Sequence, residues 1–195
     1  MANPRSAFLK ANPKWRSASK VNLRNKLLSS SEISWLRETG SLTKRIVGTV
    51  GNGFNVLVLH QKLSKPSVEE SLKLGLRPSQ GALVREVILR DRDEPLVLAR
   101  SIIPITTLAG ADRRLAHLGN RPLGQILFNH PTLRRFNLEF ARLEVPRDLD
   151  PAWLSGQPAS AMIARRSVYA IKPGHLLLVA EYFLPALFRH DVPHP

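Results

Sequence analysis

Apolar and polar residues along the chain form three pairs of β-rich runs, each pair separated by a short turn sequence. The first turn is Gly51-Asn52-Gly53, and Asn-Gly favours a hairpin because both central residues of such a turn need positive φ. The second turn is Asp91–Glu94, and the third is Lys172-Pro173-Gly174. The flanking runs are residues 45–50 and 54–59, 83–89 and 95–103, and 163–171 and 175–184. Three hairpins predict about six antiparallel strands in one sheet.

Helical signals fill the segments between these runs. Two segments have the Ser-x-x-Glu spacing of a capping box, in which side chain and backbone satisfy each other at a helix start. Further start signals are a threonine pair and a proline suited to the first turn. These signals are Ser29 with Glu32, Ser67 with Glu70, Thr106 or Thr107 before a helix towards Leu118, and Pro122. Helices grouped between hairpins predict an α+β fold, a single sheet with helices packed on one side.

Charge is concentrated at the start of the chain. The 195 residues carry a formal net charge of +14, and no acidic residue precedes Glu32. The seven basic residues before it are Arg5, Lys10, Lys14, Arg16, Lys20, Arg24 and Lys26. We therefore expect residues 1–27 to be a basic flexible arm and residues 28–195 to form the folded domain. An organellar transit peptide is the alternative for the arm, which lacks the apolar core of a secretory signal.

The composition of the chain limits the kinds of catalytic site, cellular location and partner that are expected. The chain has no cysteine, which excludes disulfides, thiolate catalysis and cysteine-based metal sites and fits a cytoplasmic location. The longest apolar run, Leu176–Ala180, is interrupted by Glu181, so no membrane span is expected. No basic stripe interleaved with aromatic residues appears in residues 28–195, so we expect no nucleic-acid partner. We expect a monomer.

Recognisable catalytic motifs are missing. The sequence contains no phosphate-binding glycine loop, nucleophile elbow or His-Glu-x-x-His motif. Its six histidines are scattered, and surface or packing roles are expected for them rather than metal ligation. We therefore expect neither a metal nor an organic cofactor.

Two charged residues lie at apolar positions of predicted strands. Counting by twos from Glu181 reaches Val179 and Phe183, and counting from Arg85 reaches Leu83 and Val87. Both side chains thus point to an apolar layer, where a buried carboxylate needs a partner. An Arg and a Glu aimed at one layer indicate a shared pocket, although a structural ion pair or a water-exposed edge position would give the same pattern.

Around these residues the sequence resembles the chorismate–pyruvate lyase family. The resemblance covers about residues 35–186, with a poorly matched stretch at 54–80. It is carried by Trp35–Arg45, by Arg85–Leu89 through Glu94-Pro95 to Ala99–Pro104 with Thr107–Gly110, by Leu118–Phe128 with Thr132-Leu133, and by Arg165–Ser167 through Leu176–Leu178 to Glu181–Pro185.

The resemblance implies a six-stranded antiparallel sheet and an enclosed site without metal or cofactor. It assigns ligand binding to the Arg85 and Glu181 side chains and to the backbone N–H groups of Leu42 and Leu123, with Arg85 and Glu181 as catalytic residues. The family commonly has Met at position 42, but Leu is acceptable because the main chain makes the contact. The substrate would be chorismate, and the products 4-hydroxybenzoate, for ubiquinone synthesis, and pyruvate.

Two questions stay open at the level of sequence. Arg100, Arg165 and Arg166 could steer a dianionic substrate, or they could be solvated strand charges. The chain could also be a non-catalytic module that binds small aromatic acids, since related folds serve as effector domains of transcription regulators. A regulator normally adds a helix-turn-helix domain, and residues 1–30 are too short and too unperiodic to form one.

Overall fold

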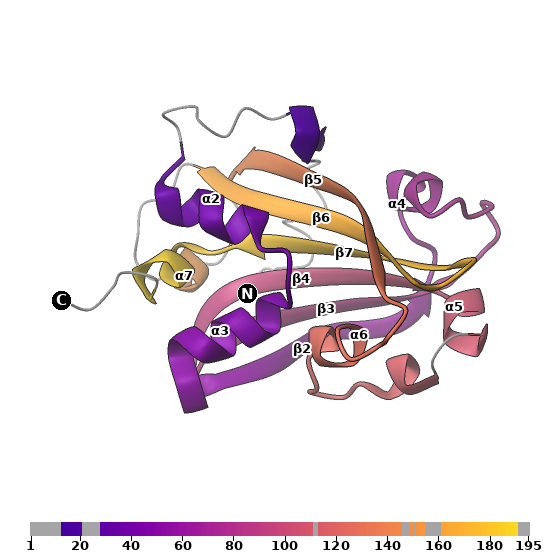
Figure 1. Ribbon diagram of the computed structural model, residues 1–195. Coiled ribbons are helices and arrows are strands. Elements are labelled where there is room, and N and C mark those ends of the chain that lie inside the picture. Colours follow the sequence, from indigo (N-terminus) through magenta and orange to yellow (C-terminus); the bar gives the residue numbers. More distant parts are fainter. Residues whose placement is uncertain are drawn as a thin grey trace.

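The computed structural model describes residues 13–20, 28–110, 113–145, 149, 151–154 and 161–190. Within them seven strands form one antiparallel sheet in the order β1-β5-β6-β7-β4-β3-β2 (Figure 1). The strands are β1 (Arg16–Ser17), β2 (Phe54–Ser64), β3 (Ala82–Asp91), β4 (Glu94–Pro104), β5 (Arg134–Glu144), β6 (Ala161–Lys172) and β7 (His175–Phe183). The expected α+β class with a single antiparallel sheet is therefore confirmed.

Helices occupy the connections between strands. They are α2 (Ser30–Arg37), α3 (Leu42–Val50), α4 (Val68–Lys73), α5 (Ile105–Gly110), α6 (Leu123–Leu127) and α7 (Pro185–His190). Short 3-10 turns are η1 (Ala18–Lys20), η2 (Gly51–Gly53), η3 (Arg113–His117) and η4 (Pro151–Leu154). Both predicted capping boxes are present, at the starts of α2 and α4. The expected helix towards Leu118 instead divides into α5 and η3, with Thr107 inside α5 rather than at its cap.

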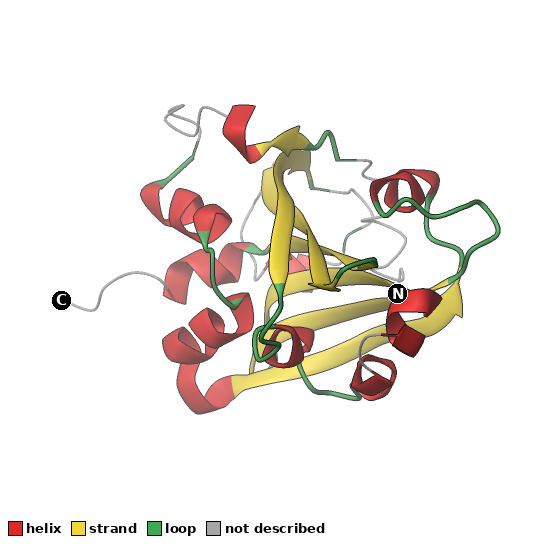
Figure 2. Ribbon diagram, turned by 45° about the vertical axis from the view of Figure 1, so that its right-hand side comes forward, coloured by secondary structure: helices red, strands yellow, loops and turns green. Residues whose placement is uncertain are grey.

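The two faces of the sheet have different covers. Helices α2, α3 and α6 cover one face, called the helix face below, with Trp35, Leu36 and Ile46 packed against strand residues such as Val87 (Figures 1 and 2). Helix α4 and η4 lie on the opposite face, where Leu74 and Trp153 pack on even-numbered strand residues. The prediction of helices on one side of the sheet therefore holds for α2, α3 and α6 but not for α4 and η4, which lie on the other side.

The predicted hairpin at Gly51-Asn52-Gly53 was wrong. Residues 45–50 belong to helix α3, and β2 pairs with β3 instead. The buried residues of α3 are Leu42 and Ile46, a spacing of four that fits a helix and not a strand. Ser41 caps the helix start by accepting from the Lys44 N–H, and Gly51, at φ 63°, ends it.

Strand β5 was not predicted from the sequence. It pairs with β6 along most of its length, with a register irregularity between Phe136 and Glu139 and a positive φ of 47° at Asn137. This bulge shifts the alternation of side chains midway along the strand, so the period-two pattern is broken in the sequence. The predicted strand at residues 45–50 is lost, and the unpredicted β5 and β1 are gained, so the sheet has seven strands rather than about six.

The start of the described chain touches the sheet. Strand β1 pairs with β5, and the Trp15 ring lies edge-on to Tyr182 at 6.2 Å between centroids. Residues 1–12 and 21–27 of the predicted basic arm lie outside the described residues, and the boundary at residue 27 stays a prediction.

Candidate active site

The four residues expected to form the site line one cavity. It lies between the helix face of the sheet and the starts of α3 and α6. Arg85, Glu181, Leu42 and Leu123 all contribute to its wall. The remaining lining is mostly apolar: Thr43, Val87, Leu89, Ala99, Ser101, Gly124, Leu127, Phe128, Tyr169 and Val179.

Arg85 is a buried cation without an acidic partner. Arg85 is 1% exposed and lies on β3, next to the edge strand β2. The guanidinium donates to the carbonyls of Gly119 at 2.9 Å and Arg121 at 3.1 Å, and to Gln61 Oε1. Among the described residues no carboxylate lies within ion-pair distance of it. Burial lowers the pKa of Arg85 to about 10, which still leaves the group charged at neutral pH. An uncompensated buried cation of this kind is suited to bind an anion.

Two helix N-termini meet beside this cation. Leu42 is the first residue of α3 and Leu123 the first of α6. First-turn N–H groups have no acceptor within their own helix, and the helix dipole favours negative charge there. The two helices approach so closely that a Cβ on Gly124 would lie 2.9 Å from Thr43 Oγ1. Glycine at 124 thus permits the close approach of the two helix starts.

Glu181 is paired with Arg165 and not with Arg85. Arg165 and Glu181 are register partners on β6 and β7, and Arg165 Nε donates to Glu181 Oε2 at 2.5 Å. Arg165 Nη1 also donates to the carbonyls of Trp35 and Glu38, at the C-terminal end of α2. Arg165 therefore fixes the catalytic candidate and the start of the α2–α3 connection together. The possibility of a structural Arg85–Glu181 ion pair is not realised.

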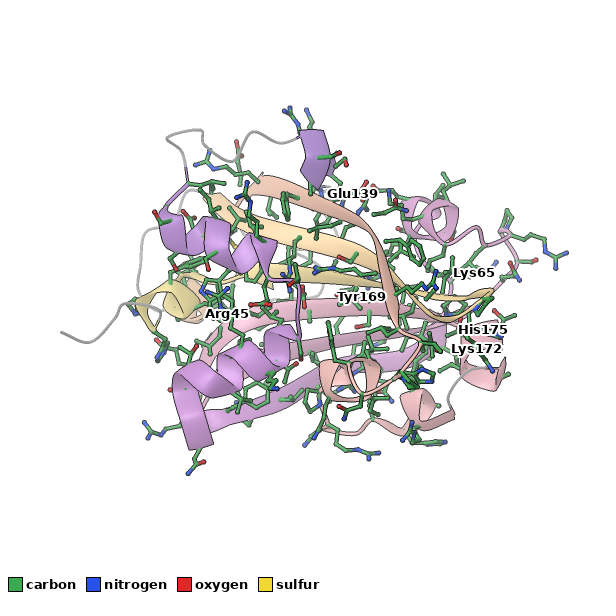
Figure 3. All side chains as sticks on the ribbon, in the orientation of Figure 1. Arg45, Lys65, Glu139, Tyr169, Lys172 and His175 are labelled. Carbon is green, nitrogen blue, oxygen red and sulfur yellow. The ribbon has the colours of Figure 1, made fainter. Side chains whose placement is uncertain are left out.

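The sequence analysis missed Tyr169, which also lines the cavity, and Arg135, which lies beside Tyr169. Tyr169 lies on β6 (Figure 3). Its ring is edge-on to that of Phe128, with 6.1 Å between the ring centroids, and burial raises the pKa of its hydroxyl. Arg135, its register partner on β5, places its guanidinium carbon 5.6 Å from the Tyr169 ring centroid. Burial is the main cause that lowers the pKa of Arg135, and the neighbouring Arg165 adds to it. Counting by twos from Arg165 along β6 would have placed Tyr169 on the helix face. Arg135 could not be placed in this way, because strand β5 was not predicted.

The other two arginines considered for substrate steering lie elsewhere. Arg100 and Arg166 point to the opposite face, where Arg100 contacts Glu70 and Glu86 and Arg166 contacts Glu139. Both are buried rather than solvated. Neither borders the cavity that holds Arg85.

The cavity has a small volume and a wider groove beside it. Its volume is about 40 Å³, smaller than the roughly 150 Å³ that holds one benzene. A groove of about 520 Å³ shares Thr43, Gly124 and Phe128 with it and is also lined by Lys44 and Val47. The two spaces are thus separated by the starts of α3 and α6, and a ring-sized ligand requires these elements to move apart.

The described residues include no group of three or more His, Asp or Glu side chains that could hold a metal ion. In the same part of the chain no helix combines the length and apolarity needed to cross a membrane.

Comparison with known proteins gives a consistent picture. Residues 9–192 match a family model described as chorismate lyase. A probable chorismate pyruvate-lyase of Methylococcus capsulatus is 51% identical over 155 residues, covering 79% of this chain and 94% of the relative. A probable chorismate pyruvate-lyase of Marinobacter nauticus is 41% identical, covering 80% of this chain and 77% of the relative.

Solved structures with a similar fold are distant in sequence. The ligand-binding domain of a GntR-family regulator from Bordetella bronchiseptica has a TM-score of 0.53 at 15% identity, covering 68% of this chain and 84% of that one. A GntR-family regulator from Bacillus cereus has a TM-score of 0.53 at 11% identity, covering 74% and 100%. At such identities the likeness concerns the fold alone.

Proposed function

This chain belongs to the chorismate lyase family, and we propose that it is a chorismate pyruvate-lyase, converting chorismate to 4-hydroxybenzoate and pyruvate. It is a carbon–oxygen lyase of the kind that supplies 4-hydroxybenzoate for ubiquinone. The observation that carries the proposal is the buried Arg85, without a carboxylate partner in the described chain, at a cavity shared with Glu181 and two helix N-termini.

The anion site fits the ring carboxylate of chorismate. Arg85 is held by three acceptors through Nη1 and Nη2, so its orientation is fixed before ligand binds. The N–H groups of Leu42 and Leu123 complete a site of three donors around one carboxylate. Apolar lining by Val87, Leu89 and Leu127 suits the ring and excludes water.

Glu181 serves the other end of the ring. The reaction breaks the bond between ring C3 and the enolpyruvyl ether oxygen and removes the hydrogen from ring C4. The enolpyruvyl fragment takes up a proton to become pyruvate, and the ring becomes aromatic. Aromatisation drives the reaction, so the protein has to position the ring, exclude water and move a proton. Glu181 is the carboxylate lining the cavity, and it acts on the proton near the 4-hydroxyl.

The small volume of the cavity determines how substrate enters and how product leaves. The groove outside α3 and α6 leads to the cavity through Thr43, Gly124 and Phe128. Substrate enters when these helix starts separate, and product that fills the same volume leaves by the same motion. Release of 4-hydroxybenzoate is therefore expected to be slow relative to the chemistry.

The direct test is pyruvate release from chorismate by the purified protein. We expect pyruvate and 4-hydroxybenzoate in equal amounts, with a first turnover faster than later ones. Arg85→Ala is the matched control, because it removes the anion site and should abolish most of the activity. A protein that binds 4-hydroxybenzoate but releases no pyruvate would be a binding module of the regulator type, and the lyase proposal would fall.

Cofactor independence, a monomeric state and a cytoplasmic location complete the proposal. Activity that survives exhaustive treatment with a chelator would support independence from a metal cofactor. Light scattering of the purified protein would test the monomeric state.

A further inference from the structure

Chorismate carries two carboxylates, and the site described so far binds only one. The ring carboxylate remains on 4-hydroxybenzoate, whereas the enolpyruvyl carboxylate leaves with pyruvate. A protein group that recognises the second carboxylate would act on the substrate and not on the aromatic product. The inference below rests on the proposed lyase function.

Arg135 has a buried N–H group with no acceptor. Its Nε donates to Ser167 Oγ at 2.8 Å and its Nη1 to the Glu38 carbonyl at 2.7 Å. Its Nη2 is buried and has no hydrogen-bond partner among the described residues. A buried donor left unsatisfied is unfavourable, and such groups in native structures call for an explanation. The two satisfied nitrogens fix the plane of the guanidinium, so the third is held in place for an acceptor.

The surroundings of Arg135 connect it to the reacting end of the cavity. Its guanidinium lies over the ring of Tyr169, which lines the cavity. The Glu38 carbonyl that it binds also accepts from Arg165 Nη1 at 2.8 Å, and Arg165 holds Glu181. The Glu38 carboxylate is occupied elsewhere, by the Gly40 N–H at 2.7 Å and Arg45 at 3.6 Å.

The charges of this cluster do not cancel. Arg135 and Arg165 carry two positive charges, and Glu181 supplies one negative charge. One positive charge is left over beside Glu181, in addition to the uncompensated Arg85. Excess positive charge thus lies at Arg85, which lines the cavity, and at Arg135, which lies against the cavity-lining Tyr169. Two such positions match a substrate with two carboxylates. In chorismate the enolpyruvyl ether is on the ring carbon next to the one bearing the hydroxyl, so its carboxylate falls near Glu181.

We propose that Arg135, through Nη2, binds the enolpyruvyl carboxylate of chorismate and makes the site selective for substrate over product. As the ether bond breaks, the same contact holds the departing fragment while Glu181 acts on the proton. Pyruvate then leaves with the carboxylate that Arg135 recognised, and 4-hydroxybenzoate remains bound through its ring carboxylate at the Arg85 site.

The test compares substrate and product in the variants Arg135→Gln and Arg135→Lys. We expect kcat/KM for chorismate to fall at least about 30-fold in the Gln variant, as for loss of one partner of a buried charge pair. The Lys variant should recover part of this loss, since it keeps the charge but not the fork. Affinity for 4-hydroxybenzoate, measured by titration, should stay within about threefold in both, which also shows that the variants fold. Arg142→Gln, which removes an exposed charge from the same strand, should match the wild type.

The outcomes separate this inference from the lyase function itself. If the wild type releases no pyruvate, the function is wrong. If the wild type is active and the Gln variant loses substrate and product binding equally, Arg135 only anchors Glu38 and the inference is overturned. Unchanged kcat/KM overturns it as well. A chorismate analogue with a neutral amide in place of the enolpyruvyl carboxylate gives an independent check, because it should no longer distinguish the Gln variant from the wild type.

Discussion

Arg85 on the helix face and the buried arginines of the opposite face differ in their partners, although Arg165 on the helix face is paired with Glu181. On the helix face Arg85 has carbonyl and amide acceptors but, within the described chain, no carboxylate partner. On the opposite face Arg100 contacts Glu70 and Glu86, and Arg166 contacts Glu139 and Glu69. Lys73 adds a further cation to Glu139 at 2.6 Å. The first arrangement leaves charge for a ligand, and the second neutralises it within the protein.

Whether the buried arginines of a cavity already have carboxylate partners identifies the candidate site better than the volume of the cavity does. The cavity on the opposite face has about 280 Å³ and is lined by Trp15, Tyr182, Arg100 and Arg166. The cavity at Arg85 has only about 40 Å³. Since the arginines of the larger cavity already have glutamates, an entering anion would have to compete with buried ion pairs. The smaller cavity offers an anion three donors at the cost of moving two helix starts.

A substitution of Glu181 tests the contrast between the two faces most strongly, because Glu181 is an ion-paired carboxylate on the helix face, where the candidate site lies. If it moves a proton, Glu181→Gln should slow single-turnover pyruvate release by roughly 10²–10⁴-fold. Binding of 4-hydroxybenzoate should stay within about tenfold, since Gln keeps the shape and can accept from the hydroxyl. A near-normal single-turnover rate would make Glu181 a mere counter-charge for Arg165, like the glutamates of the opposite face.

Arg100 tests the opposite face. Arg100→Ala removes the cation shared by the buried Glu86 and the half-buried Glu70, which should lower the free energy of unfolding by about 3–5 kcal/mol. Affinity for 4-hydroxybenzoate should change less than about threefold, because Arg100 points away from the ligand cavity. Urea unfolding and ligand titration of the same preparation measure both. Lost affinity with unchanged stability would contradict the division between the faces.

The sequence placed the candidate site residues better than it predicted the strands near the sheet edges. Parity within β3 and β7 put Arg85 and Glu181 on one apolar layer, and both line one cavity on the helix face. The backbone donors at Leu42 and Leu123 came from the family resemblance, and the structure explains them as first residues of helices.

The features that the sequence did not predict are set by strand register or by local signals that favour two different structures. Residues 45–50 are rich in β-branched side chains and precede Asn-Gly, but burial of Leu42 and Ile46 on the sheet favours the helix. Arg165 as the partner of Glu181 required the β6–β7 register, and Arg135 required the bulged strand β5. Such pairings are set by tertiary contacts that no local pattern encodes.

Arg85 is the direct counterpart of Arg100. Arg85→Ala should weaken 4-hydroxybenzoate binding by about 2–5 kcal/mol, the usual loss for one partner of a buried charge pair. It should stabilise or only mildly destabilise the ligand-free protein, because an uncompensated buried charge is removed together with its hydrogen bonds. Arg85→Lys should restore binding in part, since Lys lacks the guanidinium fork. Unchanged affinity in the Ala variant would remove Arg85 from the site.

Glu70 gives the smallest expected effect, and its pH dependence shows where the stabilising charges lie. Burial alone would raise its pKa, but the hydrogen bonds and charge of Arg100 outweigh this and hold the pKa of Glu70 below the ordinary 4.5. Because the folded pKa lies below the unfolded one, its contribution is complete above about pH 4.5 and is lost as the pH falls through the folded pKa. Glu70→Gln, which can still cap α4, should therefore lower stability by about 1–3 kcal/mol at pH 7. Urea unfolding from pH 7 to 3 should show the variant and the wild type converging in acid.

The neighbour Glu69, which is half-exposed and pairs with Arg166 at 2.8 Å, supplies the control: Glu69→Gln should change stability by less than about 1 kcal/mol. A Glu70→Gln difference that persists unchanged at pH 3 would show that Glu70 acts through packing, and the opposite face would then not be held by charge.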